Sequence, residues 1–283
     1  MKICKSKADL NQQLTNPELS SSIGFTPTMG ALHQGHLSLI KNAKDNQDLT
    51  VVSIFVNPSQ FNEPKDFENY PVQIDEDIKL LEELDVDILF LPAVEEMYPE
   101  GINNNHNYDF GLLGTLLEGE NRPGHFDGVA VIVSRLLQLV QPHNLYMGQK
   151  DYQQCLIVKS LIEQMGIETK LHICPIIREE NGLAMSSRNL LLSYEEKNEA
   201  TLIHKVLRFC KENAYKLSIP ELQSHVQKAF KDSSFFSELE YISFNDANNL
   251  SPISIIEKGA NIVISIAAKS NKVRLIDNML LIS

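Results

Sequence analysis

The sequence lacks the features that define several classes of protein. Its four cysteines are scattered through 283 residues without a C-x-x-C pair, which argues against a structural zinc site and a disulfide framework. No uninterrupted apolar run reaches the roughly 18 residues needed to cross a bilayer. The amino-terminal residues also have no apolar signal segment followed by a cleavage site. We therefore expect a cytoplasmic protein with reduced, buried cysteines and no membrane partner.

Positive charge is scarce in this chain. It has 25 Lys and Arg residues against 37 Asp and Glu residues, which gives a formal net charge of −12. A chain with this charge repels phosphate backbones and other polyanions, which disfavours a nucleic-acid substrate. Basic side chains that gather on this background therefore indicate a specific anion site.

The first part of the chain alternates short apolar runs with helical patterns, which is typical of a parallel sheet with crossover helices. The predicted strands are residues 22–26, 49–56, 87–91, 144–147 and 170–174, and the predicted helices are residues 37–44, 74–84, 129–140 and 152–165. With 43% hydrophobic residues the chain is long enough to bury a large core. The alternation predicts an α/β domain with a doubly wound, Rossmann-like parallel sheet over residues 1–182.

The pattern changes in the remaining residues. Capping boxes, formed by Ser193 with Glu196 and by Ser218 with Glu221, mark the starts of helices. The runs LEYISF, ANIVISIAA and KVRLIDNMLLI that follow have the composition of strands. We expect a second, smaller α+β domain over residues 183–283.

Two histidines lie three residues apart in the stretch TPTMGALHQGHLSLI. His33 and His36 follow a predicted strand and a Pro/Gly-containing turn, where an apolar-periodic helix starts. In an open α/β sheet ligands bind at this edge, because free N–H groups and the helix dipole attract anions there. Gly30 and Gly35 would let a nucleotide approach the backbone. The stretch predicts a phosphate site, with exposed or capping histidines as the alternative and a metal site as a weaker one.

Two further loops carry residue types that bind phosphate. LYMGQKDYQQ runs from a strand through Lys150 into a helix, and REENGLAMSSRNLLLS places Ser186, Ser187 and Arg188 in a glycine-containing connection. Taken alone, the first loop is better explained by a solvated surface lysine and the second by a polar hinge between domains. Together with the histidines, the two loops predict a site for a triphosphate.

Six motifs follow one another along the chain: PTMGALHQGHLSLI, VNPSQF, RPGHFDGV, GQKDYQQ, GLAMSSRN and RLIDN. In this order they resemble the pantoate–β-alanine ligases, a family of the nucleotidyltransferase superfamily that carries an HxGH signature. The resemblance covers nearly the whole chain. It implies that the carboxylate of pantoate attacks the α-phosphorus of ATP to give pantoyl adenylate and pyrophosphate. β-Alanine then displaces AMP, and the product is pantothenate, a precursor of coenzyme A.

The resemblance also implies roles for individual residues. His36 would donate a proton to the leaving group, and the catalytic set would be His33, His36, Lys150, Ser187 and Arg188. The implied ATP-binding residues are Met29, Gly30, His33, Gly35, His36, Gly148, Gln149, Lys150, Asp151, Ile177, Met185, Ser186, Ser187 and Arg188. Pantoate would be bound by Met29, Gln60 and Gln154, and β-alanine by Gln60. Such a reaction needs alignment and charge stabilisation and no protein nucleophile.

ATP would enter as its Mg²⁺ complex. Asp75 and Asp77 are only weak candidates for outer-sphere contacts to the ion, and no residue is assigned as a metal ligand. Three residues depart from the family pattern: Val72 replaces a usual arginine, Gln149 a usual glutamate, and Asp127 a basic or polar residue. For Arg274 and Asp277, near the carboxyl terminus, we expect an ion pair or turn at the domain interface and no catalytic role.

The expected partners are small molecules and, from the resemblance alone, a second copy of the chain in a homodimer. Val51, Val52, Ile54 and Val56 carry more apolar surface than one strand face needs, which is compatible with such an interface. Two other functions remain open. One is a nucleotidyltransferase of the same superfamily with a different acceptor, and the other is a nucleotide-binding module without activity.

Overall fold

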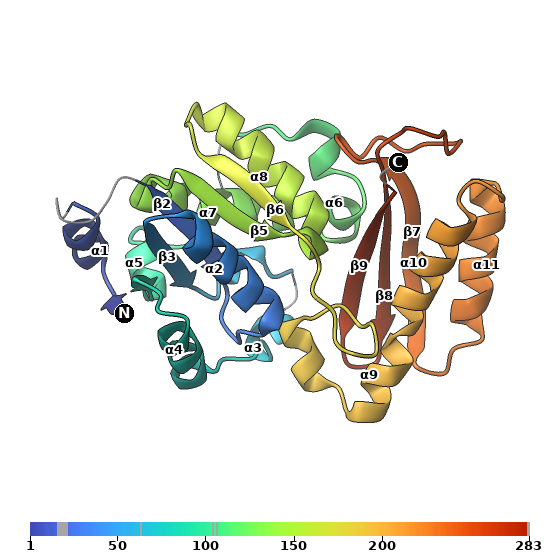
Figure 1. Ribbon diagram of the computed structural model, residues 1–283, viewed down its shortest axis with the longest axis horizontal. Helices are drawn as coiled ribbons and strands as arrows, with labels where there is room; N and C mark the ends of the chain where they lie inside the picture. The colour runs from blue at the N-terminus through green and yellow to red at the C-terminus, as the bar shows by residue number, and fades with distance from the viewer. Residues whose placement is uncertain (16–21, 63, 104, 106, 282–283) are drawn as a thin grey trace.

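The computed structural model describes residues 1–15, 22–62, 64–103, 105 and 107–281. Within them the chain forms two sheets that lie beside one another along the long axis of the molecule (Figure 1). The first sheet has six strands and the second has three. This arrangement confirms the predicted fold class, an α/β Rossmann-like part followed by a smaller α+β part.

The six-stranded sheet has the order β1-β4-β3-β2-β5-β6, and its paired strands are parallel. Its strands are β1 (Lys2–Cys4), β2 (Ile23–Thr28), β3 (Leu49–Ile54), β4 (Ile88–Phe90), β5 (Asn144–Gly148) and β6 (Lys170–Cys174). The order reverses between β2 and β5. In doubly wound sheets ligands bind in the crevice outside the carboxyl ends of the strands at this switch point.

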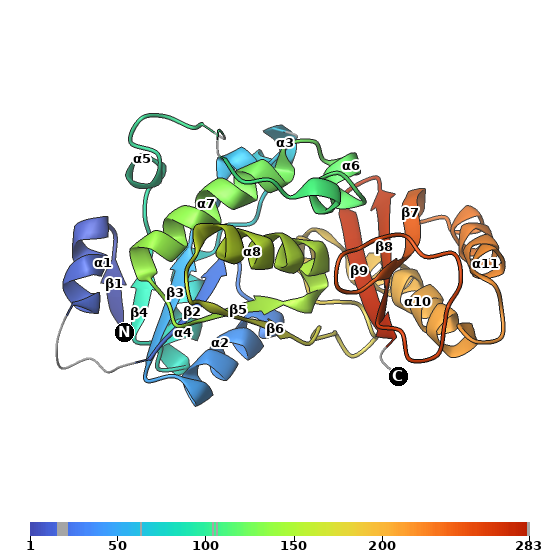
Figure 2. The same cartoon turned by 90° about the horizontal axis from the view of Figure 1, so that it is seen from above.

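Helices cover both faces of this sheet, with α7 and α8 on one side and α2 and α4 on the other (Figure 2). The longer helices here are α1 (Lys7–Leu14), α2 (Gln34–Asn46), α4 (Ile74–Glu83), α7 (His125–Val140) and α8 (Tyr152–Met165). Short helices are α3 (Pro64–Glu68), α5 (Val94–Met97) and α6 (Glu118–Asn121), and the 3-10 turns are η1 (Pro58–Gln60), η2 (Gly111–Gly114), η3 (Gln149–Asp151) and η4 (Ser187–Leu191). Helix α7 is buried on nearly every side, as its almost continuous apolar sequence requires.

The smaller part consists of α9 (Tyr194–Ala200), α10 (Leu202–Asn213), α11 (Ile219–Lys231) and the antiparallel strands β7 (Phe236–Asp246), β8 (Ile262–Ser270) and β9 (Arg274–Leu281). Helices α10 and α11 pack on one face of this sheet (Figure 1). Both predicted capping boxes are present, at Ser193 and at Ser218. The core of this part starts at Leu183 in the sequence. The predicted boundary between residues 182 and 183 stays a prediction.

Several details differ from the sequence-based prediction. Helix α2 starts at Gln34 rather than at residue 37, and α7 starts at His125 rather than at residue 129. Their first turns are rich in Gly, His and polar residues, so the apolar periodicity starts one turn late. Strand β1 and helix α1 were not predicted, because three strand residues and a helix with one buried side chain give little periodic signal. The last predicted strand run ends at residue 282, which lies outside the described residues.

The apolar surplus of β3 is explained within the chain. Val51 packs in the core on one face of the sheet, and Val52 and Ile54 pack in the core on the other. Their side chains are at most 2% exposed. A central parallel strand is buried on both faces, so its sequence is apolar at successive positions. Our interpretation of this strand as a possible dimer interface was therefore wrong for these three residues, and the homodimer stays a prediction.

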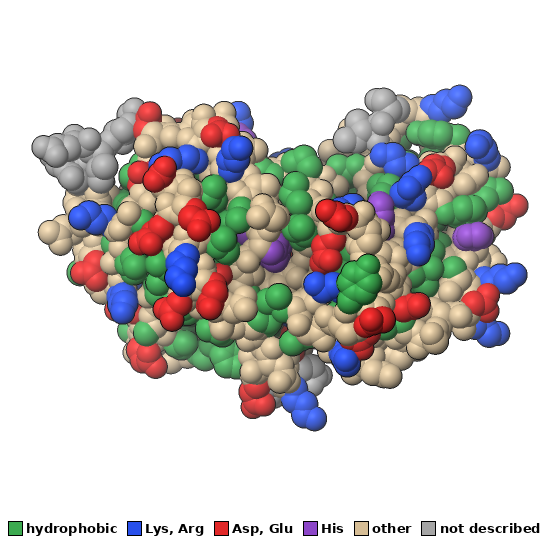
Figure 3. All heavy atoms as spheres, turned by 60° about the horizontal axis from the view of Figure 1, so that its bottom comes forward, with side chains coloured by type: hydrophobic (Ala, Val, Ile, Leu, Met, Phe, Trp, Pro, Cys, Tyr) green, Lys and Arg blue, Asp and Glu red, His purple; other side chains and the backbone are tan. Residues whose placement is uncertain are grey.

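The four cysteines are free and buried. No helix within the described residues is long and apolar enough to cross a bilayer. On the face shown in Figure 3, acidic and basic side chains are mixed, and histidine side chains are visible among apolar ones near its middle.

Candidate active site

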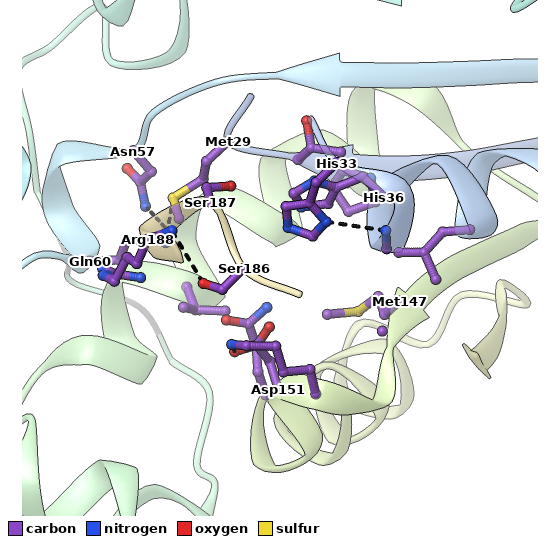
Figure 4. A pocket seen from close by; sticks show the side chains of 18 of the residues that line it. Met29, His33, His36, Asn57, Gln60, Met147, Asp151, Ser186, Ser187 and Arg188 are labelled. Carbon is purple, nitrogen blue, oxygen red and sulfur yellow. Dashed lines mark hydrogen bonds and ion pairs between the residues drawn. The ribbon is translucent and has the colours of Figure 1, made fainter. Parts of the chain in front are cut away.

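A cavity of about 230 Å³ lies at the switch point of the six-stranded sheet (Figure 4). Four of the residues that line it, Thr28, Phe55, Gly148 and Pro175, lie at or just after the carboxyl ends of β2, β3, β5 and β6. The cavity therefore occupies the position at which parallel α/β sheets bind their ligands.

Most of the predicted site residues meet in this cavity. Its lining includes Met29, His33, Gly35, His36, Gln60, Gly148, Lys150, Asp151, Gln154, Ile177, Met185, Ser186, Ser187 and Arg188. These residues come from segments that are far apart in the sequence. The predicted ATP-binding residues Gly30 and Gln149 lie outside the lining. Arg122 and His125 of RPGHFDGV also line the cavity, so the structure brings together five of the six motifs.

His33 is the N-cap of helix α2. Its Nδ1 accepts a hydrogen bond of 3.1 Å from the backbone N–H of Gly35. A β-carbon on Gly35 would lie 2.8 Å from the His33 ring, so the ring already requires glycine at this position. Burial, together with the nearby charge of Lys150, lowers the pKa of His33 to about 4. At neutral pH the ring is therefore neutral, with its proton on Nε2 because Nδ1 is an acceptor.

His36 stacks on His33 with ring centroids 4.0 Å apart. Burial, followed by the influence of His33 and Lys150, holds the pKa of His36 well below its ordinary value. Its Nδ1 is buried and has no hydrogen-bond partner among the described residues. His33, His36 and Lys150, which we call the histidine side of the cavity, thus combine two neutral imidazoles with one cation. A buried polar atom of this kind costs stability and is typical of a functional site.

Asp77 holds the loop that carries the histidines. Its two carboxylate oxygens accept hydrogen bonds of 2.8 and 2.7 Å from the backbone N–H groups of Ala31 and Leu32. Gly30 has φ +80°, and a β-carbon there would lie 3.0 Å from Asp77 and from Ile54. The glycine is therefore explained by backbone conformation and close packing. Asp77 is 1% exposed and does not line the cavity, so the structure gives it a structural role in place of the weak expectation of a magnesium contact.

The MSSR segment lines the cavity and contacts the loop that carries the histidines. Ser187 donates a hydrogen bond of 3.0 Å to the carbonyl of Ala31, and the Oγ of Ser186 accepts one of 3.3 Å from the backbone N–H of Arg188. The guanidinium of Arg188 is paired with Asp66 of helix α3, with 2.9 Å between Nη2 and Oδ2. The predicted phosphate ligands are therefore at the cavity, but Ser187 and Arg188 are engaged with protein groups.

Gln60 lies across the cavity from the two histidines (Figure 4). Its Oε1 accepts from Asn57 at 3.1 Å, and its Nε2 lies 3.0 Å from the sulfur of Met29. The carbonyl oxygen of Gln60 accepts from His125 Nδ1 at 2.8 Å and from Arg122 Nη2 at 3.3 Å. We call Asn57, Gln60, Arg122 and His125 the glutamine side of the cavity. Here each side chain is held by its neighbours.

Several lining residues were missed by the sequence analysis. Asn57, Arg122 and His125 belong to the motifs VNPSQF and RPGHFDGV, which carried the resemblance but received no role for these positions. An apolar wall comes from one side of α7 and consists of Val129, Ile132, Val133 and Leu136. The sequence predicted α7 as a packing helix, and periodicity does not show that one of its sides faces a cavity.

The small sheet reaches the site through its last strand. Asn278 of β9 donates hydrogen bonds to the carbonyls of Gln149 and Lys150 at 2.8 and 2.9 Å. The side-chain amide of Gln149, one of the departures from the family pattern, donates back to Asn278 at 3.1 Å. The 3-10 turn that carries Lys150 is therefore held by the carboxyl-terminal part of the chain. Val72, another departure, is 64% exposed.

Ion pairs join the two parts of the molecule. Arg178 pairs with Asp277 of β9 at 2.6 Å, as expected for a structural aspartate at the interface. Arg274 donates two hydrogen bonds of 2.7 Å to Glu118 of α6. Burial raises the pKa of Glu118, but Arg274 and, to a lesser degree, Tyr241 lower it to about 2. Both Arg274 and Asp277 thus have structural partners.

Comparison with known proteins identifies the family. The sequence model of the pantoate-beta-alanine ligase family matches residues 2–280. The pantothenate synthetase of Cytophaga hutchinsonii is 45% identical over 263 residues, which cover 92% of this chain and 92% of that protein.

Solved structures agree with this match. The crystal structure of pantothenate synthetase from Thermus thermophilus has a TM-score of 0.90 and 39% identity, and covers 99% of both chains. The pantoate-beta-alanine ligase of Francisella tularensis, crystallised with beta-gamma ATP and β-alanine, has a TM-score of 0.82 and 38% identity, and covers 99% of this chain and 97% of that one. The chain therefore belongs to the pantoate–β-alanine ligase family.

Proposed function

We propose that the cavity joins pantoate to β-alanine in two steps, through a pantoyl adenylate formed from ATP. The observation that carries this proposal is the pairing of two different sides in one cavity. The neutral histidines at the N-terminus of α2, together with Lys150 of η3, suit the phosphates of ATP. The amide of Gln60 across the cavity suits a hydroxy acid. The Francisella tularensis ligase, with its beta-gamma ATP and β-alanine, supports the same assignment.

The phosphates of ATP are assigned to the histidine side. The N-terminus of α2 supplies backbone N–H groups, and the Nε2–H of His33 can donate without adding a full charge. Lys150 is 3.5 Å from Asp151 and supplies the positive charge. Gly148 and Ile177 line the same cavity, and their backbone groups are assigned to the nucleoside. These groups are in position before the reaction, which is the condition for electrostatic stabilisation of a transition state.

Pantoate is assigned to the glutamine side and to the apolar wall of α7. Its two hydroxyls and carboxylate need hydrogen-bond partners, which the amides of Gln60 and Gln154 can supply. Its two methyl groups need an apolar surface, which Val129, Ile132 and Val133 provide. Burying each methyl group contributes about 0.8 kcal/mol. β-Alanine is assigned to the same side, next to Gln60.

In the first step a carboxylate oxygen of pantoate forms a bond to the α-phosphorus, and the bond from that phosphorus to the bridging oxygen breaks. The electron pair leaves with pyrophosphate, whose growing charge is met by His36, Lys150 and Arg188. In the second step the amine of β-alanine attacks the activated carbonyl carbon, AMP leaves, and the amine loses a proton. The protein aligns the reactants and supplies no nucleophile.

Three finer assignments complete the proposal. Magnesium enters bound to ATP as part of the substrate. The proposal assigns no protein side chain as a ligand of the ion, which phosphate and water oxygens can hold. The chain works as a homodimer, and it works in the cytoplasm.

Exchange of labelled pyrophosphate into ATP tests the proposed function. The exchange should depend on pantoate and should proceed without β-alanine. A nucleotidyltransferase with another acceptor would exchange only with that acceptor, and a binding module would exchange with none. Exchange that ignores pantoate would therefore refute the proposal.

A further inference from the structure

The side chain of Arg188 already has an anionic partner before any phosphate arrives. Its Nη2 lies 2.9 Å from Oδ2 and 3.2 Å from Oδ1 of Asp66, and its Nε lies 3.3 Å from Oδ1. The guanidinium also lies over the ring of Tyr70, 5.6 Å from its centroid. This geometry is that of a forked arginine–carboxylate pair, in which both partners are oriented.

Asp66 holds the arginine from outside the cavity. Arg188 lines both the cavity and the neighbouring cleft between the two parts of the molecule, while Asp66 lines only the cleft. Asp66 is in the short surface helix α3, and its side chain is 40% exposed. The carboxylate is therefore free to turn toward water if a stronger anion takes the guanidinium.

A polyphosphate would be such an anion. Lys150 and Arg122 line the same cleft as Arg188, so several cations face this space in a chain of net charge −12. An arginine can donate two parallel hydrogen bonds to a phosphate as well as to a carboxylate. Asp66 occupies the edge formed by Nε and Nη2, so a phosphate that binds this edge competes with Asp66 for the same donors.

We propose that Asp66 is a positioning residue that holds Arg188 at the mouth of the cavity and is displaced by the β- and γ-phosphates of ATP. This inference rests on the proposed function, because it assumes that ATP is the ligand of the cavity. Asp66 keeps the arginine extended in the free protein. Breaking this pair costs free energy, so ATP binds less tightly than it would without the Asp66 carboxylate.

The test is the affinity of Asp66→Asn for α,β-methylene-ATP, measured by calorimetry with Mg²⁺ and without pantoate. Asparagine keeps the shape of the side chain but removes its charge, so it competes less for Arg188. A partly exposed pair is worth about 0.2–1 kcal/mol. We therefore expect binding about 1.4- to fivefold tighter than in the wild type. The gain should shrink at high salt, because salt screens exposed charges.

Two controls separate the pair from a general effect of charge. Glu68→Gln removes a neighbouring exposed carboxylate from the same helix and should leave the affinity unchanged. AMP lacks the β- and γ-phosphates, so Asp66→Asn should bind AMP as the wild type does. Glu68→Gln removes the same charge from the same helix but leaves the pair of Asp66 and Arg188 intact. AMP binding tests the Asp66→Asn variant with a ligand that has no phosphates to compete with Asp66.

A double-mutant cycle gives the sharpest result. In the Arg188→Ala background the Asp66→Asn change should no longer tighten binding of α,β-methylene-ATP. If the tightening persists there, or if Asp66→Asn binds the analogue no better than the wild type, Asp66 is not a competitor and the inference fails. The proposed function is tested separately, by pantoate-dependent exchange in the wild type. An active wild type with an unaltered Asp66→Asn affinity would refute only the inference.

Discussion

The histidine side and the glutamine side of the cavity differ in how far protein groups satisfy the hydrogen bonds of their polar atoms. On the histidine side, His36 Nδ1 is buried without a hydrogen-bond partner among the described residues. On the glutamine side, the carbonyl and the side chain of Gln60 are held by Asn57, Arg122 and His125.

This difference agrees with the ligands that we propose for the two sides. A ligand that keeps its shape, such as a hydroxy acid, is recognised best by amides that neighbouring groups already orient. A charge that grows only in the transition state needs donors that are not satisfied by the protein in the ground state. The glutamine side therefore holds its amides in fixed orientations. The histidine side leaves a buried polar atom unsatisfied, which lowers stability but leaves that atom available to the reaction. The predictions below test this division.

Replacement of His36 should have the largest effect. His36→Ala removes a preorganised donor from the histidine side, so we expect adenylate formation to slow by about two to three orders of magnitude. The measurement is single-turnover release of pyrophosphate from ATP and pantoate. The fold should be retained, as judged by circular dichroism.

His225→Ala is the matched control, because His225 stacks on Phe209 in the small carboxyl-terminal part, and it should react at the wild-type rate. A loss smaller than about threefold in His36→Ala would make His36 a structural residue.

Arg188→Ala should separate the two half-reactions. In the proposed mechanism its guanidinium stabilises the charge on the leaving pyrophosphate, so we expect the first step to slow by about 10- to 100-fold, the range of a hydrogen bond to a charged group. With preformed pantoyl adenylate and β-alanine, the rate should return to within about threefold of the wild type, because the β- and γ-phosphates have left. Equal losses in both steps would mean that Arg188 stabilises the structure of the site rather than the leaving pyrophosphate.

Ser187→Ala extends the same experiment. Its hydroxyl donates to the carbonyl of Ala31 and so also holds the histidine loop. Preformed adenylate should therefore restore this variant less completely than Arg188→Ala.

Gln60→Ala and Gln154→Ala should mainly impair the use of pantoate. A buried hydroxyl left without its partner costs about 1–3 kcal/mol, which corresponds to a KM for pantoate raised by about 5- to 150-fold. The KM for ATP should change little, since the phosphates are assigned to the histidine side. Initial-rate kinetics with each substrate varied in turn provide the measurement. The opposite pattern, with ATP affected and pantoate unaffected, would exchange the roles of the two sides.

The sequence predicted the elements that depend on local pattern. Alternating apolar runs and helices located the strands of the large sheet, and the order of motifs located the histidines, Lys150 and Gln60. These predictions succeed because hydrophobic periodicity and turn chemistry act over a few residues.

What the sequence did not show depends on contacts between distant segments. Asp66 and Arg188 are 122 positions apart, and Glu118 and Arg274 are 156 apart. Neither pair has a local signal. Gly35 was explained at first by the approach of a nucleotide, but the structure shows that the His33 ring fills the space beside it. Only a three-dimensional arrangement distinguishes these causes.

The smallest effect should be seen in the dependence of stability on pH. The pKa of His33 is lowered to about 4 in the folded protein, against an ordinary value of 6.5. Between these two values the unfolded chain binds a proton at this position that the folded chain does not bind, so the free energy of unfolding must fall as the pH is lowered from about 7 to 5. Protonation would also turn Nδ1 from an acceptor into a donor and break its hydrogen bond with the N–H of Gly35. In His33→Gln the side-chain oxygen can still accept that bond but cannot titrate, so the loss between pH 7 and pH 5 should be smaller than in the wild type by about 2 kcal/mol. Urea unfolding at the two pH values measures the difference.

The buried imidazoles of His36 and His125 have lowered pKa values as well, so part of the slope should remain. An unchanged slope in His33→Gln would mean that His33 does not titrate below its ordinary range, and the neutral donor assigned to the histidine side would lose its support.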